Sequence, residues 1–343
     1  MLPDPAAIAA AAGLLEAGQL VAFPTETVYG LGADAENPAA VALIYQAKGR
    51  PSNHPLIVHL APQADVGYWS NEVSAAAVKL MAAFWPGPLT LILPRAARIP
   101  AAVAGGQDSI GLRCPAHPVA QALLRSFRGG RGGVAAPSAN RFGHVSPTMA
   151  QHVREEFADV PLLQCVLDGG QSMVGIESTI LDLSRGRPVL LRPGHIDAEQ
   201  IAAVLGVMPA LPDSTAPRAS GTLASHYAPR TPVVVLPAAA LADALFQLAR
   251  SGRRVALMHH GEVETIADAR QLASLAARAA LPADAVGYAH DFYAALRRLD
   301  LHDADLILVQ ALPATAAFQA LADRLSRAAH GSVDVLARLL APA

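Results

Sequence analysis

The spacing of the apolar, strand-like runs constrains the fold more than any other feature of this sequence. Up to about residue 205 these runs alternate with helical segments, such as the one that follows Asn37-Pro38. Such alternation is typical of an α/β sheet with parallel strands. However, the last two runs, "STILDL" (178–183) and "PVLLRP" (188–193), are too close for a helix between them. They must pair antiparallel, so we predict a twisted mixed sheet with helices.

The length and the proline distribution predict two domains. A chain of 343 residues exceeds what one hydrophobic core usually supports. Residues 206–232 carry five prolines and little periodicity, which is typical of a semi-rigid linker. Beyond them, apolar runs and helical patterns alternate again. We therefore expect a first domain over 1–205, a linker over 206–232 and a smaller Rossmann-like α/β domain over 233–343.

The composition excludes several classes of protein. The net charge of -2 gives no global sign of a nucleic-acid binder, although a local patch of arginines remains compatible with RNA binding. Cys114 and Cys165 form no CxxC pair, as in a reducing compartment, and both are expected to be ordinary buried thiols. No apolar run approaches roughly 20 residues, so we predict no membrane span and a cytoplasmic location. The arginines that could form the local patch are Arg125, Arg128, Arg131 and Arg141.

Common nucleotide and metal motifs are missing from the sequence. There is no GxxxxGK[ST] phosphate loop, and the nominal GxGxx[GA] match that begins at Gly130 lies between a helix and a strand in the wrong order. The adjacent His259 and His260 are expected to pack or to lie at the surface. Because no carboxylate cluster is evident, we predict no metal site built by the protein.

One turn carries an unusual density of hydroxyl groups. The stretch "AFPTETVYGLG" follows a buried strand that Pro24 must end, since proline cannot donate to the strand ladder. Thr25, Thr27 and Tyr29 therefore lie at a strand end, where open α/β sheets bind ligands. The alternative is an ordinary turn whose threonines satisfy backbone groups.

Other polar residues also lie at the ends of apolar runs. Lys48 is one of only two lysines beside 24 arginines, and its neighbour Arg50 adds a planar cation. Cations from three separate regions among many hydroxyls suit a polyanion and a small polar ligand. The full set is Lys48, Arg50, His54, His59, Arg113, Ser138, Asn140, Ser178, Thr179 and Arg192.

Six motifs, in order, closely resemble the YrdC/Sua5 family, and the linker with "HYAP" resembles its long, Sua5-type members. The motifs are "FPTETVYGLG", "KGRP", "PLIVH", "APSAN", "GIESTI" and "LRPG". The resemblance implies a YrdC-like catalytic domain over 1–205 and a Sua5 domain over 233–343. It also implies a nucleotidyltransferase that converts L-threonine, bicarbonate or CO2, and ATP into threonylcarbamoyl-AMP and pyrophosphate. Its product would serve N6-threonylcarbamoyladenosine formation at position 37 of tRNAs reading ANN codons, through a downstream transferase machinery.

The resemblance also implies roles for individual residues. Lys48, Arg50, Ser138 and Asn140 are expected to carry catalysis. L-Threonine is expected near Thr27, His59, Arg113, Ala136 (through its backbone) and Ser178. ATP contacts are expected at Arg50, His54, Ser109, Ser138, Ser146, Arg192 and His226. His226 and Tyr227 of the linker are expected to act as a lid, and Mg²⁺ is expected to arrive with ATP.

Two other functions remain open on the sequence. An RNA-binding module would use the local arginines, and even the synthase could make a weak contact with tRNA. A carbamoyl-phosphate-dependent transferase is a second alternative, because related domains occur in hydrogenase maturation proteins. Those proteins carry zinc-finger and acylphosphatase modules, which have no counterpart here.

Overall fold

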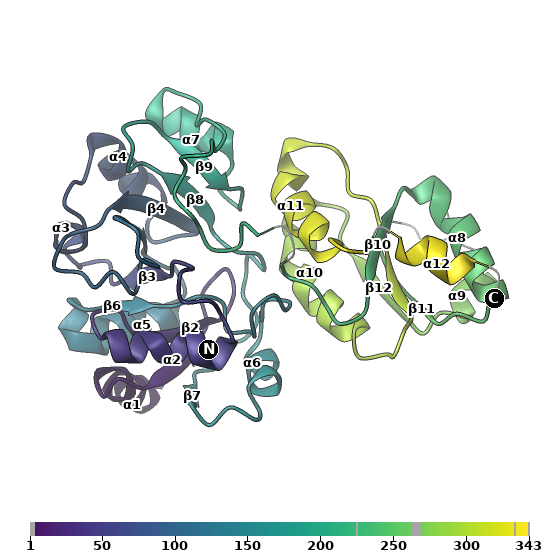
Figure 1. Cartoon of the computed structure of the whole chain (residues 1–343), viewed down its shortest axis with the longest axis horizontal. Helices are drawn as coiled ribbons and strands as arrows, with labels where there is room; N and C mark the ends of the chain where they lie inside the picture. Colours follow the sequence, from purple (N-terminus) through teal and green to yellow (C-terminus); the bar gives the residue numbers. More distant parts are fainter. Residues whose placement is uncertain (1–3, 224–225, 262–268, 333, 342–343) are drawn as a thin grey trace. The chain divides into compact units, whose positions relative to one another are not determined.

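The computed structural model of this chain describes residues 4–223, 226–261, 269–332 and 334–341. It divides into two compact units (Figure 1). The first contains Met1–Phe142 and Ser146–Thr222, and the second contains Gly143–Val145 and Leu223–Ala343. Residues 206–222 of the proline-rich segment thus fold with the first unit and residues 226–232 with the second. Residues 224–225 of that segment lie outside the described residues.

The first unit contains helices around one large sheet. Its helices are α1 (Pro5–Glu16), α2 (Pro38–Lys48), α3 (Val66–Trp69), α4 (Ala75–Phe84), α5 (Pro118–Ser126), the 3-10 turn η1 (Phe127–Gly130), α6 (Ala150–Glu156) and α7 (Ala198–Leu205). Its strands are β1 (Leu20–Phe23), β2 (Gly30–Asp34), β3 (Ile57–Leu60), β4 (Leu89–Pro94), β5 (Ser109–Arg113), β6 (Gly133–Ala135), β7 (Leu163–Val166), β8 (Thr179–Asp182) and β9 (Val189–Arg192).

The large sheet is mixed, as predicted. The strand order is β7-β1-β2-β6-β3-β5-β4-β8-β9. β3 and β5 pair parallel, with His59 opposite Arg113, whereas β4 and β5 pair antiparallel. The predicted antiparallel pairing of the two closely spaced runs is confirmed, because β8 and β9 pair in that sense.

The two faces of this sheet are covered differently. One face packs Leu20, Val58 and Leu112 into a large core under α2 and α4. The opposite face packs against α1 and α5 around Phe23 and Val134. On its other half, Ile57, Ile92 and Ile180 belong to a small apolar cluster, against which Ala210, Ala216 and Ala219 pack. Because side chains alternate along a strand, His59 and Arg113 share this second face with Ile57.

Local sequence signals explain where several helices begin and end. Asn37 caps α2 by accepting from the amides of Ala39 and Ala40, and Gly49 ends the helix at φ 62°, a left-handed conformation that glycine adopts at low cost. Lys48 is therefore the last residue of α2, and the chain changes direction directly after it. Ser146-Pro147 also resembles a capped helix start in sequence, but this prediction is wrong: α6 begins at Ala150, and the Ser146 hydroxyl bonds to Glu177.

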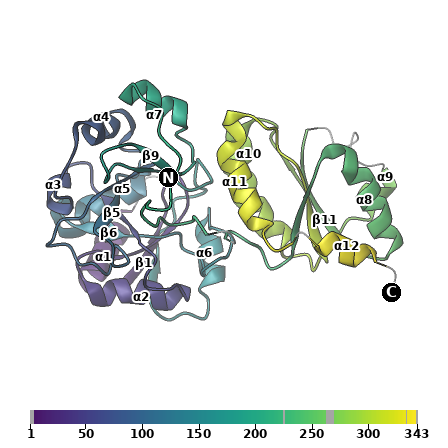
Figure 2. The same ribbon diagram turned by 45° about the horizontal axis from the view of Figure 1, so that its top comes forward.

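The second unit is a parallel α/β sheet. Figures 1 and 2 show the sheet between α10 and α11 on one side and α8, α9 and α12 on the other. The strand order is β10-β13-β11-β12, and all pairings are parallel. Its elements are β10 (Val233–Leu236), α8 (Ala238–Arg250), β11 (Val255–His260), α9 (Ala269–Ala273), β12 (Ala277–Leu281), α10 (Ala285–Leu299), β13 (Leu306–Gln310), η3 (Ala316–Phe318), α11 (Gln319–Ala328) and α12 (Val335–Leu340).

The sequence missed one strand of the second unit. The segment between the apolar runs "RRVALMHH" (253–260) and "DLILVQ" (305–310) was expected to be helical throughout, yet it contains β12. Its sequence, "ARAAL", lacks the β-branched and aromatic residues that signal a strand. Pairing with β11 over five residues fixes it in the sheet despite this low propensity.

Candidate active site

The hydroxyl-rich turn is tightly folded around Thr25. The Thr25 hydroxyl donates to the carbonyl oxygen of Val28 at 2.6 Å and lies 2.8 Å from the hydroxyl of Thr27. It also accepts from the amides of Thr27 and Val28. Thr25 therefore has the structural role of an ordinary turn residue, and it orients the Thr27 side chain.

The Thr27 side chain points toward Arg113, so these two predicted site residues lie together. Arg113 Nη1 donates to the Thr27 hydroxyl at 2.9 Å, although the two residues come from different strand ends. Arg113 Nη2 lies 2.5 Å from a carboxylate oxygen of Glu26, and Nε donates to the carbonyl oxygen of Gly87 at 3.2 Å. Both side chains of the ion pair are buried. The guanidinium is thus held in one orientation at the end of β5.

Lys48 joins a second group of the predicted residues. Its ammonium donates to the carbonyl oxygen of Ser138 at 2.6 Å and to that of Asn140. Burial, followed by the charge of Arg50, lowers the pKa of Lys48 well below 10.5, and Glu156 acts weakly in the opposite direction. The "APSAN" loop is therefore fixed beside the C-terminus of α2.

Arg50, Arg192 and Ser178 form a third group, which Ser220 connects. Arg50 Nη2 donates to the Ser220 hydroxyl at 3.1 Å, and Arg192 Nη1 donates to the Ser220 carbonyl oxygen at 2.8 Å. Arg192 also holds the Ser178 carbonyl oxygen through Nε and Nη2, at 3.0 and 2.8 Å. The Ser178 hydroxyl in turn lies 2.8 Å from that of Thr90 on β4. Residues from distant segments thus meet on one face of the sheet.

His59 is a neutral imidazole within this face. Burial, with a smaller contribution from the charge of Arg113, lowers the pKa of His59 to about 3. Its Nδ1 is a buried atom without a hydrogen-bond partner among the described residues. The ring lies edge-on to Phe23, with centroids 6.1 Å apart. A buried imidazole nitrogen of this kind is suited to a hydrogen bond with a ligand.

The remaining predicted contacts of the first unit lie around these groups. His54 packs edge-on against Phe142, and burial together with Arg50 lowers its pKa. The Ser146 hydroxyl donates to Glu177 at 2.6 Å. The amide of Ala136 donates to the Ile57 carbonyl oxygen at 2.9 Å, so only the Ala136 carbonyl could face a ligand.

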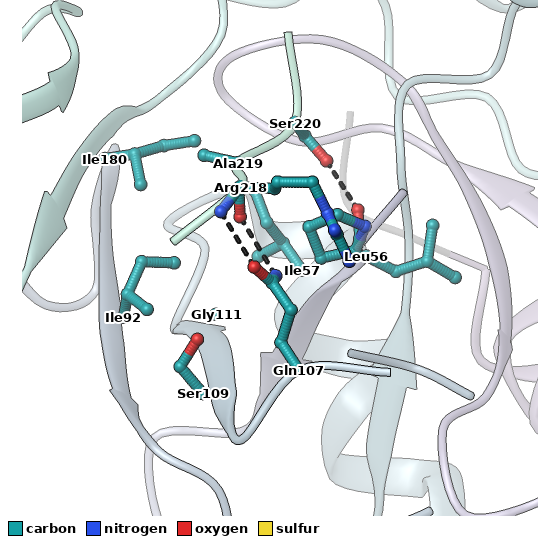
Figure 3. Close-up of a pocket in the computed structure, with 11 residues that line it drawn as sticks. Leu56, Ile57, Ile92, Gln107, Ser109, Gly111, Ile180, Arg218, Ala219 and Ser220 are labelled. Atoms are coloured by element: carbon teal, nitrogen blue, oxygen red, sulfur yellow. Dashed lines mark hydrogen bonds between the residues drawn. The ribbon is translucent and has the colours of Figure 1, made fainter. Parts of the chain in front are cut away.

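Ser109 lines a small cavity under the 218–220 segment (Figure 3). Figure 3 shows the Gln107 side chain directed toward the backbone of Arg218. Gln107 Oε1 accepts from the Arg218 amide at 2.8 Å, and Gln107 Nε2 donates to the Arg218 carbonyl oxygen at 3.1 Å. The cavity has a volume of about 10 Å³, with Ile57, Gly111 and Ile180 in its lining. The segment therefore lies close to the apolar part of the face.

His226 and Tyr227 belong to the second unit. Their rings are 4.1 Å apart, and Tyr227 packs near Tyr293 and under the guanidinium of Arg324. Tyr227 has a φ of 62°, which is a strained conformation for a residue with a side chain. The nucleotide contact of His226 and the lid function of both residues stay predictions.

Three of the four arginines of the local patch have partners within the first unit. Arg128 pairs with Asp34 and Glu36, and Arg141 pairs with Asp159. Arg125 bonds to Gln121 one helical turn away. Cations already paired with carboxylates contribute less to phosphate binding.

Two further findings concern metals and membranes. Among residues 4–223, 226–261, 269–332 and 334–341, no group of three or more His, Cys, Asp or Glu residues could hold a metal ion. Within the same ranges, no helix has the length and apolarity that crossing a membrane requires.

Burial raises the pKa of Cys114 to about 11, which is typical of a structural thiol rather than of a nucleophile.

The sequence reasoning missed three residues that hold the site together. Glu26 stands between two of the singled-out threonines, but its partner Arg113 lies 87 positions away. Ser220 lies in the segment interpreted as a spacer, and Thr90 lies within the apolar run "LTLIL" (89–93), which shows no sign of a site. An acidic residue inside an otherwise uncharged turn was the one available signal.

Known proteins match this chain over nearly its full length. Residues 13–194 match the Sua5/YciO/YrdC family model, described as telomere recombination, and residues 196–330 match the C-terminal domain of threonylcarbamoyl-AMP synthase. The threonylcarbamoyl-AMP synthases of Bacillus subtilis and Pyrococcus abyssi are 40% and 36% identical. The first alignment covers 95% of this chain and 94% of the relative, and the second covers 93% and 92%.

A solved structure extends the agreement to three dimensions. The crystal structure of Pyrococcus abyssi Sua5 complexed with L-threonine matches with a TM-score of 0.85 and 35% identity. The match covers 95% of each chain. Since both family models and full-length relatives match, this chain belongs to the Sua5/YciO/YrdC family, in the two-domain form that carries the Sua5 C-terminal domain.

Proposed function

We propose that this protein synthesises threonylcarbamoyl-AMP from L-threonine, bicarbonate or CO2, and ATP, with release of pyrophosphate. The names of its full-length relatives and the L-threonine complex of a structural relative support this activity. The enzyme is then a nucleotidyltransferase, and its product supplies a tRNA-modifying threonylcarbamoyl transferase machinery in the cytoplasm. A weak direct contact with tRNA is compatible with this function but has no specific support.

The reaction requires that two anions meet in one site. The threonine amine adds to CO2 to form a carbamate, and a carbamate oxygen then attacks the α-phosphorus of ATP. The new P–O bond forms as the bond to the pyrophosphate oxygen breaks, so negative charge leaves with pyrophosphate. Holding both anions in line, with cations beside the phosphates, is the main contribution that a protein can make.

Lys48, Arg50 and Arg192 are our choice for the nucleotide charge. All three are buried, and Ser220 brings the two arginines to one place. A bound phosphate would stabilise the protonated Lys48, opposing the desolvation that lowers its pKa. Ser138, Asn140, Ser146 and Ser109 supply further contacts to the nucleotide or the carbamate.

Threonine is proposed to lie near His59 and Arg113, which are opposite one another on β3 and β5. Arg113 would bind the threonine carboxylate, and Thr27, Ser178 and the Ala136 carbonyl would complete the pocket. Mg²⁺ is proposed to enter with ATP, because the carboxylate of Glu26 is already committed to Arg113 and that of Glu177 accepts from Ser146.

The single observation that carries this proposal is the meeting of Arg50 and Arg192 at Ser220. Residue 50 follows α2, residue 192 ends β9, and residue 220 lies in the proline-rich segment, so only the fold unites them. A polyanion bound beside Ser220 would interact with both buried arginines at once, through charge-assisted hydrogen bonds.

The test is pyrophosphate release from ATP in the presence of bicarbonate and one of several amino acids. We expect release with threonine, at least about 100-fold reduced in Lys48→Ala and Arg50→Ala. Lys79→Ala removes the other lysine, which lies exposed on α4, and should retain full activity. Equal release with every amino acid, or salt-sensitive tRNA binding without any release, would contradict the proposal.

A further inference from the structure

Glu26 holds Arg113 from one side while the backbone holds Glu26 from the other. One carboxylate oxygen lies 2.5 Å from Arg113 Nη2, and the other accepts from the amide of Ala116 at 3.0 Å. The Glu26 carbonyl oxygen accepts from the amide of Val174. The 113–116 segment therefore fixes both carboxylate oxygens, Val174 fixes the backbone of the same residue, and the Glu26 side chain is only 8% exposed.

The contacts of Arg113 leave a defined remainder of donors. A guanidinium carries five N–H groups: one on Nε and two on each terminal nitrogen. Nε donates to Gly87, Nη1 to Thr27 and Nη2 to Glu26, and each uses one N–H. Among the described residues, one N–H on each terminal nitrogen remains, and two N–H groups are the number that a carboxylate takes in a bidentate pair.

We propose that Glu26 is a positioning residue, which orients Arg113 so that its two remaining N–H groups bind the α-carboxylate of the substrate. The inference rests on the proposed function, because it concerns how that site selects threonine. Glu26 itself touches no substrate in this account. It acts by neutralising a buried guanidinium and by preventing its rotation, so that the order is present before the substrate arrives.

A purely structural role makes a different prediction. If Glu26 only stabilised the turn, its loss would weaken every ligand of the site to the same extent. If Glu26 orients Arg113, its loss must weaken ligands that carry an α-carboxylate more than ligands without one. The ratio of two affinities therefore distinguishes the two roles, whereas overall activity does not.

Glu26→Gln is the informative substitution. Both carboxylate oxygens accept from N–H donors, so either orientation of the amide places its NH2 group against Arg113 or against the Ala116 amide. Glu26→Asp keeps the charge but shortens the side chain by one methylene, and should restore part of the function. Glu36→Gln is the matched control, because Glu36 pairs with Arg128 rather than with Arg113.

The experiment measures binding of L-threonine and of L-threoninol, which lacks the carboxylate, to the full-length protein by calorimetry. We expect Glu26→Gln to weaken threonine binding by about tenfold or more and threoninol binding by less than about threefold. Glu26→Asp should lie between this variant and the wild type, and Glu36→Gln should match the wild type. Should Glu26→Gln fail to fold by circular dichroism, the affinity ratio in Glu26→Asp decides.

The outcomes separate this inference from the proposed function. A wild-type protein that does not bind threonine would contradict the function itself. A wild type that binds threonine, together with a Glu26→Gln variant that keeps the wild-type ratio of threonine to threoninol affinity, would overturn the positioning role. Equal weakening of both ligands is one form of this outcome, and it is the result that a merely structural role predicts.

Discussion

Arg50 donates a hydrogen bond to the hydroxyl of Ser220 at 3.1 Å, across 170 positions of sequence. The same serine donates to the Pro55 carbonyl oxygen at 2.8 Å. The proline-rich segment therefore supplies an acceptor to a cation that we assign to the phosphates. A nucleotide phosphate that binds Arg50 through the same Nη2 would compete with Ser220 for this donor.

Removing the Ser220 hydroxyl should strengthen ATP binding. A hydrogen bond to a charged group contributes about 1.5–3 kcal/mol, part of which the incoming phosphate must replace. We expect Ser220→Ala to lower the dissociation constant of ATP by about three- to tenfold, measured by calorimetry. Thr222→Ala is the control, because its hydroxyl bonds only to Ala219 nearby. Weaker ATP binding in Ser220→Ala would instead make Ser220 a nucleotide ligand.

Replacing Arg192 by lysine should not preserve activity. Arg192 uses three nitrogens on Ser178 and Ser220, a forked arrangement that one ammonium cannot reproduce. We expect kcat/KM for ATP to fall by about 100-fold in Arg192→Lys, which corresponds to the loss of two charge-assisted hydrogen bonds. Steady-state pyrophosphate release measures this. A loss below about threefold would show that charge alone suffices at this position.

Acid should destabilise the first unit through His59. The folded-state pKa of His59 is about 3, below the unfolded value of 6.5, so the unfolded chain binds a proton that the folded protein does not. The stabilising effect is complete above pH 6.5 and declines as the pH falls toward 3, by up to about 1.4 kcal/mol per pH unit. Urea titrations between pH 3 and 6.5 measure the free energy of unfolding at each pH. In His59→Gln, the slope of this free energy against pH should decrease by the His59 contribution. A slope in His59→Gln that equals the wild-type slope would contradict this contribution.

Two glycines should respond oppositely to alanine. Gly13 lies inside α1, and beyond its chain neighbours and the backbone of its own helix no atom lies within 4 Å of an added Cβ, so Gly13→Ala should stabilise the protein by about 0.5–1 kcal/mol. At Gly133 an added Cβ would lie 2.5 Å from the Trp69 ring and 2.6 Å from Val58. Gly133→Ala should destabilise the protein by about 1–3 kcal/mol. Thermal unfolding of both variants checks the pair, and equal effects would contradict the packing described.

The sequence predicted the architecture well where local signals and tertiary packing agree. The short gap between β8 and β9 forced an antiparallel pair, and the predicted cap at Asn37 marks a real helix start. It failed at β12, where pairing with β11 overrides the low strand propensity of alanine. It also failed at Ser146, whose hydroxyl resembles a helix cap in sequence but bonds to a glutamate 31 positions away.

The sequence singled out the residues of the site more readily than their connections. Lys48 was notable because lysine is rare here, and the structure joins it to Ser138 through the backbone carbonyl. No local pattern indicates that Glu26 meets Arg113, or that Ser220 meets Arg192. Those contacts depend on the order of strands in the sheet and on the path of the proline-rich segment over it.

The most direct test of the central claim follows one carbon atom. The purified protein is incubated with ATP, L-threonine and ¹³C-labelled bicarbonate, and the nucleotide products are analysed by mass spectrometry. A site that joins threonine carbamate to the α-phosphate should yield an AMP adduct that contains threonine and one labelled carbon, together with pyrophosphate. An AMP–threonine adduct without the label would contradict that claim, as would pyrophosphate release that does not depend on bicarbonate.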